Sequence, residues 1–435
     1  MKKSPPKSSF ARTKVIGQVA GRIAGKKIAT STKSLFLSAD DKNSLRARSR
    51  QEIAQIIFDG LAQLRGTALK LAQLFCGETG LLPQEYMKVF EQSHYRVPPL
   101  SSVLVRTVIR RELGEDPSHL FAEFDAQAIG AASLGQVHRA RLKSGEVVAV
   151  KVQYPGISET LVTDFALARK MLMPFGNTGL IQTVMTELEI RLKQEVDYLA
   201  EMQHLDWFRG KELPEGIRLP KVFKQHSTTT VLTMEYVKGQ QLDEWLATKP
   251  DQMRVNRIAN ALFSFFVTSV FKWNRLHADP NFGNFIITDQ DEIVVIDFGA
   301  VKVMRPADVE FYRLLWATPV DSNAMDLVKI YLEHGAELNI EDPQQTKNLL
   351  ENAIRPYLLW IQTMIRHEKF DFKKNDDFTR LGHQIFSAQL FNEQLQNFDS
   401  SLTLVHRTLL GLVVIFQRLG SEIEIEKHRS LWNAK

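Results

Sequence analysis

Residues 277–299 read HADPNFGNFIITDQDEIVVIDFG and hold three polar side chains at a characteristic spacing. Four residues separate Asp279 from Asn284, and twelve more separate Asn284 from Asp297. The β-branched run 292–296 predicts a buried strand that ends at Asp297. The whole stretch reads as a β-hairpin, which carries the chain away and back. We therefore expect the three side chains to converge on one cleft.

This spacing is typical of a kinase catalytic loop. In such a loop the first Asp, here Asp279, faces the hydroxyl group that attacks the γ-phosphate, and Asn284 and Asp297 hold magnesium. The string D-F-G alone recurs by chance, whereas the full D-x4-N-x12-D-F-G array is specific. We expect a structural role for His277, which would pack against the D-F-G backbone and bond to it.

Upstream, a strand–turn–strand pattern carries a candidate phosphate-binding lysine. Residues 135–142 and 147–152 read as strands, and Ser144-Gly145 is a hairpin signal between them. Lys151 stands in V-A-V-K, close to the V-A-I-K pattern whose Lys binds the α- and β-phosphates. A Lys beside a strand is often a solvated edge charge, but the apolar residues around Lys151 and the downstream array favour nucleotide binding.

Such a lysine needs a glutamate on a helix to hold it. An apolar stripe at three- and four-residue steps predicts one long helix over 179–205. Glu201 is the best partner for Lys151, and Glu195 and Asp197 precede it on the same predicted helix. An acidic cluster on a helix is commonly a solvated face. Three acids on the helix that should line the nucleotide cleft make that interpretation weaker.

The remaining segments fit the same layout. Residues 229–237 read as a buried strand, and we expect the backbone around Glu235–Val237 to accept adenine. An apolar helix over 253–274 leads into the catalytic loop, and beyond Val303 the chain reads as helical. No A-P-E motif and no activation loop of ordinary length follow. Substrate positioning must therefore differ from that of ordinary protein kinases.

Composition favours a soluble intracellular enzyme. The 435 residues, 44% of them hydrophobic, suffice for one large or two medium cores. The single cysteine, Cys76, excludes an internal disulfide and suits a reducing cytosol. No apolar stretch approaches the ~18 residues that span a bilayer, and the closest, 261–271 and 409–416, read as buried helix. We expect a cytoplasmic protein, or a mitochondrial one in a eukaryote.

The net charge of +5 belongs to the N-terminal tail. Residues 1–39 contain nine Lys or Arg and no acid, so the rest of the chain sets 46 of the 55 basic residues against all 50 acidic ones. A mildly acidic body argues against nucleic-acid binding. Gly17, Gly21 and Gly25 would share one face of a helix, where another helix or a membrane surface approaches closely. A solvated basic tail and a mitochondrial presequence are the alternatives.

The chain resembles the UbiB (AarF) family of atypical kinase-like proteins, linked to ubiquinone and other isoprenoid-lipid metabolism. Four motifs between residues 60 and 303 carry the resemblance: the K-x-G-Q-like Lys70-Leu-Ala-Gln73, the alanine-rich Gly130-Ala131-Ala132-Ser133, the E-x-D-Y segment Glu195-Val-Asp-Tyr198, and the catalytic loop 277–285. The alanine-rich segment stands where ordinary kinases have a glycine-rich loop, so we expect a stiffer loop here. Gly130 departs from the family pattern, which has a further alanine.

The resemblance implies an α+β, bilobal protein-kinase-like fold that binds ATP and Mg²⁺. Its parts would be a basic flexible tail or amphipathic helix (1–40), an N-terminal helical extension (41–120), a small β-rich N-lobe (121–238) and a larger helical C-lobe (239–435). Asp279 and Lys151 would be catalytic, and Asn284 and Asp297 would bind the metal. The implied ATP-binding residues are Gly130, Ala131, Ala132, Ser133, Lys151, Glu201, Glu235 and Val237.

In this family the K-x-G-Q helix resembles a built-in lid, whose Lys reaches the E-x-D acids and occupies the space of a protein substrate. Carried over, Lys70 and Gln73 would face Glu195 and Asp197 across the nucleotide site. A Lys–carboxylate pair in a partly dry cleft is strong enough to hold such a lid. The main departure is Ala72, which stands where the family has Gly and alters how closely the helix approaches.

The leading hypothesis is an atypical kinase that acts as an ATPase, or as a small-molecule or lipid kinase, in ubiquinone or other isoprenoid-lipid metabolism. Its expected partners are ATP, a lipid or quinone-precursor ligand and a membrane surface met by the basic N-terminus, with no nucleic acid. The alternative is a nucleotide-gated scaffold or lipid-handling regulator without phosphotransfer. Asp279 favours chemistry, whereas an occluding Lys70 helix favours gating. An ordinary protein kinase and an aminoglycoside- or choline-type kinase fit less well.

Overall fold

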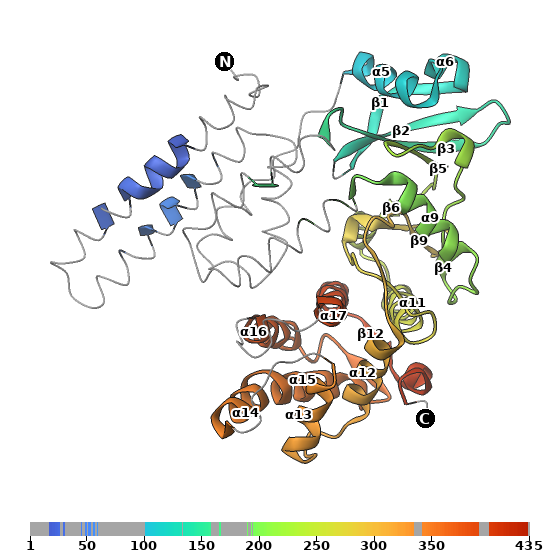
Figure 1. The fold of residues 1–435 in the computed structure, drawn as a ribbon. Coiled ribbons are helices and arrows are strands. Elements are labelled where there is room, and N and C mark those ends of the chain that lie inside the picture. The colour runs from blue at the N-terminus through green and yellow to red at the C-terminus, as the bar shows by residue number, and fades with distance from the viewer. Residues whose placement is uncertain are drawn as a thin grey trace. The chain divides into compact units, whose positions relative to one another are not determined.

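The computed structural model covers most of the chain beyond residue 100 (Figure 1). It describes residues 17–26, 29–30, 45, 48–49, 51–53, 55–56, 59, 101–132, 134–157, 165–166, 189, 193, 195–334, 342–390 and 400–433. Two compact units are described separately: unit 1 comprises Met1–Arg111, Ala126–His138 and Lys151–Val196, and unit 2 comprises Glu112–Asp125, Arg139–Val150 and Asp197–Lys435.

A four-stranded sheet follows the order β1-β2-β3-β5. Its strands are β1 (Phe121–Ala132), β2 (Gly135–Leu142), β3 (Val147–Gln153) and β5 (Val231–Glu235). Strands β2 and β3 lie where the sequence predicts them, and Gly145, with φ +102°, turns the chain between them. Residues other than glycine rarely adopt this φ. The Ser-Gly turn signal therefore predicted the position of the hairpin correctly.

The alanine-rich segment differs from its prediction. Gly130, Ala131 and Ala132, predicted to form a phosphate-covering loop, form the end of β1 instead. Alanine lacks the ready access of glycine to positive φ values, and sheet pairing satisfies backbone groups that a loop leaves to water or ligand. The loop prediction is therefore wrong for these three residues.

The long helix predicted over 179–205 is interrupted. A turn precedes α9 (Tyr198–Arg209), and the carboxylate of Asp197 accepts a hydrogen bond at 3.0 Å from the backbone N–H three residues on. A short acidic side chain is favoured in this capping position. Glu195 and Asp197 therefore do not share a helix with Glu201, and that part of the prediction is wrong.

Two small sheets form around the 277–299 stretch. One follows the order β4-β9-β8-β6, and the other pairs β10 with β7. The hairpin strands β8 (Phe285–Ile287) and β9 (Ile293–Val295) are antiparallel, and β9 is fully buried. The predicted hairpin and buried strand are confirmed. The other strands are β4 (Ile217–Arg218), β6 (Gln240–Gln241), β7 (Arg275–His277) and β10 (Val301–Val303).

Helices make up most of the rest of unit 2. The apolar helix predicted before the catalytic loop is α11 (Gln252–Phe271), whose Phe263, Phe265 and Phe266 are buried in the core. In Figure 1, α12 to α17 are drawn in orange and red after it. The further α-helices of this unit are α6 (Pro117–Leu120), α10 (Leu242–Ala247), α12 (Pro306–Ala317), α13 (Ala324–Leu332), α14 (Pro343–Leu349), α15 (Arg355–Ile365), α16 (Phe378–Leu390) and α17 (Ser400–Leu419), whereas most of α5 (Ser102–Leu113) belongs to unit 1.

A last antiparallel pair, β11 (Lys369–Asp371) with β12 (Glu422–Glu424), joins the chain on either side of α16 and α17. Sheets in one stretch and helices in the next confirm the predicted α+β class. Among the described helices, none combines the length and the apolar character needed to cross a membrane.

Candidate active site

The catalytic loop holds Asp279 and Asn284 in direct contact. The side-chain amide of Asn284 donates to the carboxylate of Asp279 at 2.6 Å, and to its carbonyl oxygen at 3.1 Å. The loop folds tightly because Asn281 caps the 3₁₀ turn Phe282–Asn284, with its side-chain oxygen accepting from Gly283 N at 3.0 Å. Since Nδ2 of Asn284 points at Asp279, the other end of that amide, Oδ1, is the atom that a cation would meet.

The Asp-Phe-Gly segment is held through its backbone at each residue. His277 Nε2 lies 2.7 Å from Asp297 O, Phe298 N donates to Glu201 Oε1 at 3.4 Å, His204 Nδ1 lies 3.3 Å from Phe298 O, and Gly299 N donates to Asp297 Oδ1 at 2.9 Å. The predicted bond between His277 and this backbone is confirmed. With its main chain held in this way, the segment presents the Asp297 side chain in a defined place.

The ring of Phe298 anchors the segment to α9. It is fully buried, and its centroid lies 5.2 Å from that of Phe208 and 5.1 Å from that of His277. Aromatic pairs at such distances contribute about 0.5–1.5 kcal/mol beyond the area that they bury. In kinases the packing of this Phe distinguishes active from inactive arrangements. Here it packs on α9, the helix that carries Glu201.

Sequence patterns did not single out His204, which also contacts the segment. It lies on α9 three residues after Glu201, and this spacing places both side chains on one face of the helix. Burial lowers the pKa of His204, and its hydrogen bond to the carbonyl of Phe298 opposes that effect in part. A neutral imidazole with its proton on Nδ1 makes this bond. The three-residue spacing from Glu201 is the signal that could have identified it.

The candidate metal ligands are the carboxylate of Asp297 and the side-chain amide oxygen of Asn284. Ile296 N donates to Asn284 O at 3.0 Å, which ties the strand before Asp297 to the catalytic loop. Across the described ranges, no group of three or more His, Cys, Asp or Glu side chains is arranged to hold a metal. Two oxygen ligands suit Mg²⁺, which keeps several waters and takes phosphate oxygens as further ligands. The donor set therefore fits Mg²⁺ bound together with a nucleotide.

Lys151 lies near the end of β3 and is 8% exposed. A Lys is rarely buried unless it is paired, so a solvated edge charge, the alternative raised by the sequence, does not describe it. Two residues on, Gln153 Nε2 donates to Val196 O at 2.7 Å. Glu201, with 2% of its surface exposed, belongs to the other unit. Its pairing with Lys151 stays a prediction.

The segment expected to accept adenine, Glu235–Val237, begins at the last residue of β5. The Glu235 carboxylate accepts from Arg218 at 2.7 Å and from Lys221 N at 3.2 Å, so its side chain is occupied by structural contacts. The Tyr236 N–H donates to Val147 O at 3.1 Å. Val237 is buried, with 7% of its surface exposed. The Glu235 N–H also donates, to Lys221 O at 2.8 Å, and contact between this backbone and adenine stays a prediction.

The predicted lid falls largely outside the described residues, as do Lys70, Ala72, Gln73 and Ser133. Of its acidic partners, Glu195 lies in a helical turn before the break, and Asp197 caps α9. The contact between the lid and these acids stays a prediction.

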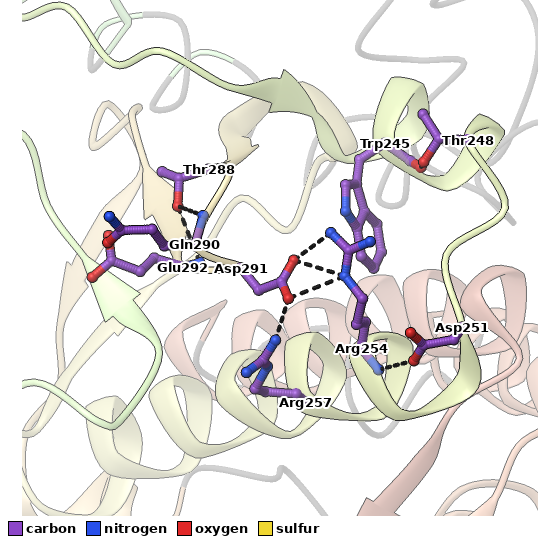
Figure 2. Close-up of polar contacts among 9 residues, drawn as sticks. All are labelled: Trp245, Thr248, Asp251, Arg254, Arg257, Thr288, Gln290, Asp291 and Glu292. Carbon is purple, nitrogen blue, oxygen red and sulfur yellow. Dashed lines mark hydrogen bonds and ion pairs between the residues drawn. The ribbon is translucent and has the colours of Figure 1, made fainter.

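A charged clamp fixes the β8–β9 hairpin to α11 (Figure 2). Asp291 sits in the turn with φ +58°, a conformation that Asp tolerates better than most residues. Arg254 Nε lies 2.9 and 3.0 Å from its two carboxylate oxygens, and Arg257 also contacts it. The hydrogen bond from Arg254 is the main cause that lowers the pKa of Asp291. The sequence gives no sign of this clamp, because Asp291 lies 37 residues from Arg254 and 34 from Arg257.

The fold and the catalytic loop define a kinase-like protein. The model of the ABC1 atypical kinase-like domain matches residues 92–331, which is more than half of the chain. The chain belongs to this family, whose named relatives include the AarF domain-containing and coq-8 kinases of the UbiB group. The resemblance stated from the motifs is therefore confirmed.

Three curated relatives indicate the range of similarity. The chain is 34% identical over 262 residues to Protein ACTIVITY OF BC1 COMPLEX KINASE 7, chloroplastic, of Arabidopsis thaliana (59% of this chain, 38% of that protein). It is 31% identical over 324 residues to AarF domain-containing protein kinase 1 of Mus musculus (69% and 59%). It is 25% identical over 437 residues to Atypical kinase coq-8, mitochondrial, of Caenorhabditis elegans (97% and 56%). The chain thus spans between 38 and 59% of the length of these relatives.

A solved structure shares the fold. A Mycobacterium tuberculosis protein, determined in complex with erythromycin, superposes with a TM-score of 0.56 over 89% of this chain and 97% of its own. The two sequences are 22% identical, so the likeness supports the fold alone.

Proposed function

We propose that this chain binds ATP with Mg²⁺ and acts as an ATPase, or as a small-molecule or lipid kinase. The observation that carries the proposal is the 2.6 Å hydrogen bond from Asn284 to Asp279, beside a D-F-G segment whose backbone is held at each residue. Phosphoryl transfer uses an Asp of this loop to accept the proton and an Asn to hold the metal, and the two candidates are in contact here. The kinase names of the relatives support the same class.

Each residue of the loop has a role in this proposal. Asp279 orients the attacking hydroxyl group or water and accepts its proton. Asn284 donates to one carboxylate oxygen of Asp279 and so leaves the other facing the nucleophile. The side-chain oxygens of Asn284 and Asp297 would hold Mg²⁺, which when bound neutralises charge on the phosphate oxygens.

The other nucleotide contacts follow from the family resemblance. Lys151, held by Glu201, would bind the α- and β-phosphates. The end of β1 at Gly130–Ala132 and the adjoining Ser133 would lie over the phosphates, and the backbone around Glu235–Val237 would accept adenine. A strand end in place of a glycine-rich loop offers fewer free N–H groups, so the phosphates would depend more on Lys151 and Mg²⁺.

The lipid side of the proposal rests on the UbiB family, whose link to ubiquinone and isoprenoid lipids makes a quinone precursor or lipid the expected ligand. Membrane contact would involve the basic residues 1–39. Residues 17–26 are helical, and a Cβ added at Gly17, Gly21 or Gly25 would meet no atom of the described residues within 4 Å. Deleting residues 1–39 should abolish binding to anionic liposomes, and unchanged binding would contradict membrane contact. Cytoplasmic or mitochondrial placement stays part of the proposal.

The proposal is tested by Mg²⁺-dependent ATP hydrolysis of the purified chain, with and without anionic liposomes. Asp297→Asn removes the metal-binding carboxylate, and Asp289→Asn makes the same change at an exposed position of the β8–β9 turn. Hydrolysis lost only in Asp297→Asn would support phosphoryl transfer. ATP binding without hydrolysis in the wild type would favour the nucleotide-gated scaffold. Failure to bind ATP would contradict both.

A further inference from the structure

One face of α17 lies directly against the catalytic loop. A Cβ added at Gly411 would lie 2.5 Å from Pro280 Cγ, and 3.5 and 3.6 Å from Pro280 Cβ and Cδ. Farther along the helix, the guanidinium carbon of Arg418 lies 4.6 Å from the ring centroid of Phe282. Residues seven apart share one face of a helix. This face of α17 therefore follows the loop from Pro280, which is bonded to Asp279, to Phe282.

Gly411 makes the close approach between α17 and the loop sterically allowed. It stands within a 20-residue helix, where glycine is less favourable than alanine. Its neighbours Leu409, Leu410 and Leu412 are buried apolar side chains that suit the helix. The atom that an added Cβ would meet belongs to a proline ring, which cannot turn aside as the end of a flexible side chain can. The contact with Pro280 thus gives a physical reason for glycine at this position.

We infer that α17 is a positioning element of the active site, with Gly411 and Arg418 as the residues that set the place of the catalytic loop. This helix lies beyond residues 92–331, the part matched by the family model. The inference rests on the proposed function only where it concerns activity. As an account of what holds the loop, it stands on the contacts alone.

A shift of Pro280 would reach the reacting group directly. Asp279 O accepts hydrogen bonds from Asn281 N at 2.9 Å and from Asn284 Nδ2 at 3.1 Å, so the residues around Pro280 form one tight turn. The added Cβ and Pro280 Cγ would be 2.5 Å apart, whereas an ordinary contact is 3.4–4 Å, so the two groups must move apart by about 1 Å. A misplacement of this size at a catalytic group lowers rates by up to about 100-fold.

The chain offers a matched control on the neighbouring helix α16. A Cβ added at Gly382 would lie 2.8 Å from Leu410 Cδ1 and from Trp360 Cζ2, and no atom of the catalytic loop is among its nearest contacts. Gly382→Ala therefore overfills the same helical layer, but its methyl group meets the side chains of Leu410 and Trp360 and does not touch Pro280 itself. Both variants should lower Tm. Only Gly411→Ala should lower kcat for ATP, by about 10- to 100-fold, with KM changed less than about threefold.

A second-site change separates displacement of the loop from general damage. Pro280→Ala removes the Cγ with which the new methyl group of Gly411→Ala collides. In the Pro280→Ala background, Gly411→Ala should change kcat by less than about threefold, since the two changes share one contact. Effects that multiply independently in the double variant would overturn the inference, as would an equal loss of kcat in Gly382→Ala.

Hydrogen exchange of residues 277–287 provides a readout that needs no activity. The amides of Asn281 and Asn284 close the turn, donating at 2.9 and 3.0 Å. Gly411→Ala should speed exchange in this segment, whereas Gly382→Ala should not. If the wild type hydrolyses no ATP but this difference appears, the proposed function fails and the positioning role holds. Unchanged exchange in Gly411→Ala would overturn the positioning role whatever the activity.

Discussion

The Nε2 atom of His277 lies 2.7 Å from the carbonyl oxygen of Asp297, twenty residues further along the chain. The pairing of β7 with β10, which places His277 opposite Val301, brings them together. His277 is buried, with 7% of its surface exposed, and its ring centroid lies 5.1 Å from that of Phe298 and 6.1 Å from that of Phe265. This contact joins the two ends of the 277–299 stretch into one site.

Replacing His277 by Phe should weaken both the fold and the site. The Phe ring keeps the aromatic packing but leaves the Asp297 carbonyl without this donor, which lowers the free energy of unfolding by about 1–3 kcal/mol. ATP hydrolysis should fall roughly tenfold because Asp297 loses a backbone anchor. Urea unfolding and kcat measure the two effects. His334→Phe, which removes a contact to the carbonyl of Ile330 in α13, should affect stability only.

Asp279→Asn should abolish turnover while nucleotide binding persists. The Asn side-chain oxygen still accepts from Asn284, so the loop keeps its shape, but it cannot accept a proton from the nucleophile. We expect kcat to fall about 10²- to 10⁴-fold, with the Kd of a fluorescent ATP analogue within a factor of three. Turnover equal to that of Asp289→Asn would argue against Asp279 as the base.

Asp291→Asn should loosen the hairpin. Asn tolerates the positive φ of the turn but loses the charge-assisted bonds from Arg254 and Arg257. We expect a loss of about 1 kcal/mol in the free energy of unfolding, because the two arginine side chains are 39% and 55% exposed and solvent screens them. Urea unfolding at low and high salt measures it, and the loss should shrink at high salt.

The same clamp has a predictable dependence on pH. Arg254 holds the pKa of Asp291 below its usual value. The stabilisation is therefore present above the unfolded pKa of about 3.9 and disappears as the pH falls through the folded pKa. The wild type and Asp291→Asn should converge in stability in acid. If the difference in stability between wild type and Asp291→Asn stayed constant down to low pH, the negative charge of Asp291 would not be what stabilises the hairpin.

His406→Phe should make the fold less sensitive to mild acid. His406 stacks on Tyr357 with centroids 3.9 Å apart, and burial lowers its pKa to about 3. Below the unfolded pKa of about 6.5 the unfolded state binds more protons, so the stability falls as the pH drops toward 3. Phe keeps the stacking and removes this titration.

The measurement for His406 is urea unfolding at pH 7 and pH 5. The wild type should lose about 2 kcal/mol more than His406→Phe across this range. Burial also lowers the pKa of His204, His383 and His428, but these groups are common to both proteins and cancel in the comparison. An equal loss of stability in the wild type and in His406→Phe would contradict a lowered pKa of His406 in the folded protein.

Local patterns predicted the strands and the hairpin well. The β-branched run at Ile293–Val295, the Ser-Gly turn before β3 and the apolar helix α11 all appear where they are expected. Their signals arise from residues a few positions apart, which meet within one element. The prediction failed at Asp197, because an apolar stripe at helical spacing continues on both sides of a capping residue and gives no sign of the break.

The candidate site was predicted in part for the same reason. Asp279, Asn284 and Asp297 lie on one hairpin, so their spacing was enough to bring the first two into contact and to tie the third to the same loop. The sequence did not predict a role for His204 because its partner, the carbonyl of Phe298, lies 94 residues away. The contact itself leaves no periodic trace in either element, and the three-residue spacing of His204 from Glu201 on α9 is the one local hint.

The sequence alone thus identifies a kinase-like catalytic hairpin and its family, since those depend on spacing within a short segment. The support beneath that hairpin comes from packing. Arg254 on α11 binds Asp291 in the hairpin turn. Gly411 contacts Pro280 because the fold packs together two segments that lie 131 residues apart in the sequence. Close packing allows no overlap between them, so the identity of a residue such as Gly411 has a reason only in the folded chain.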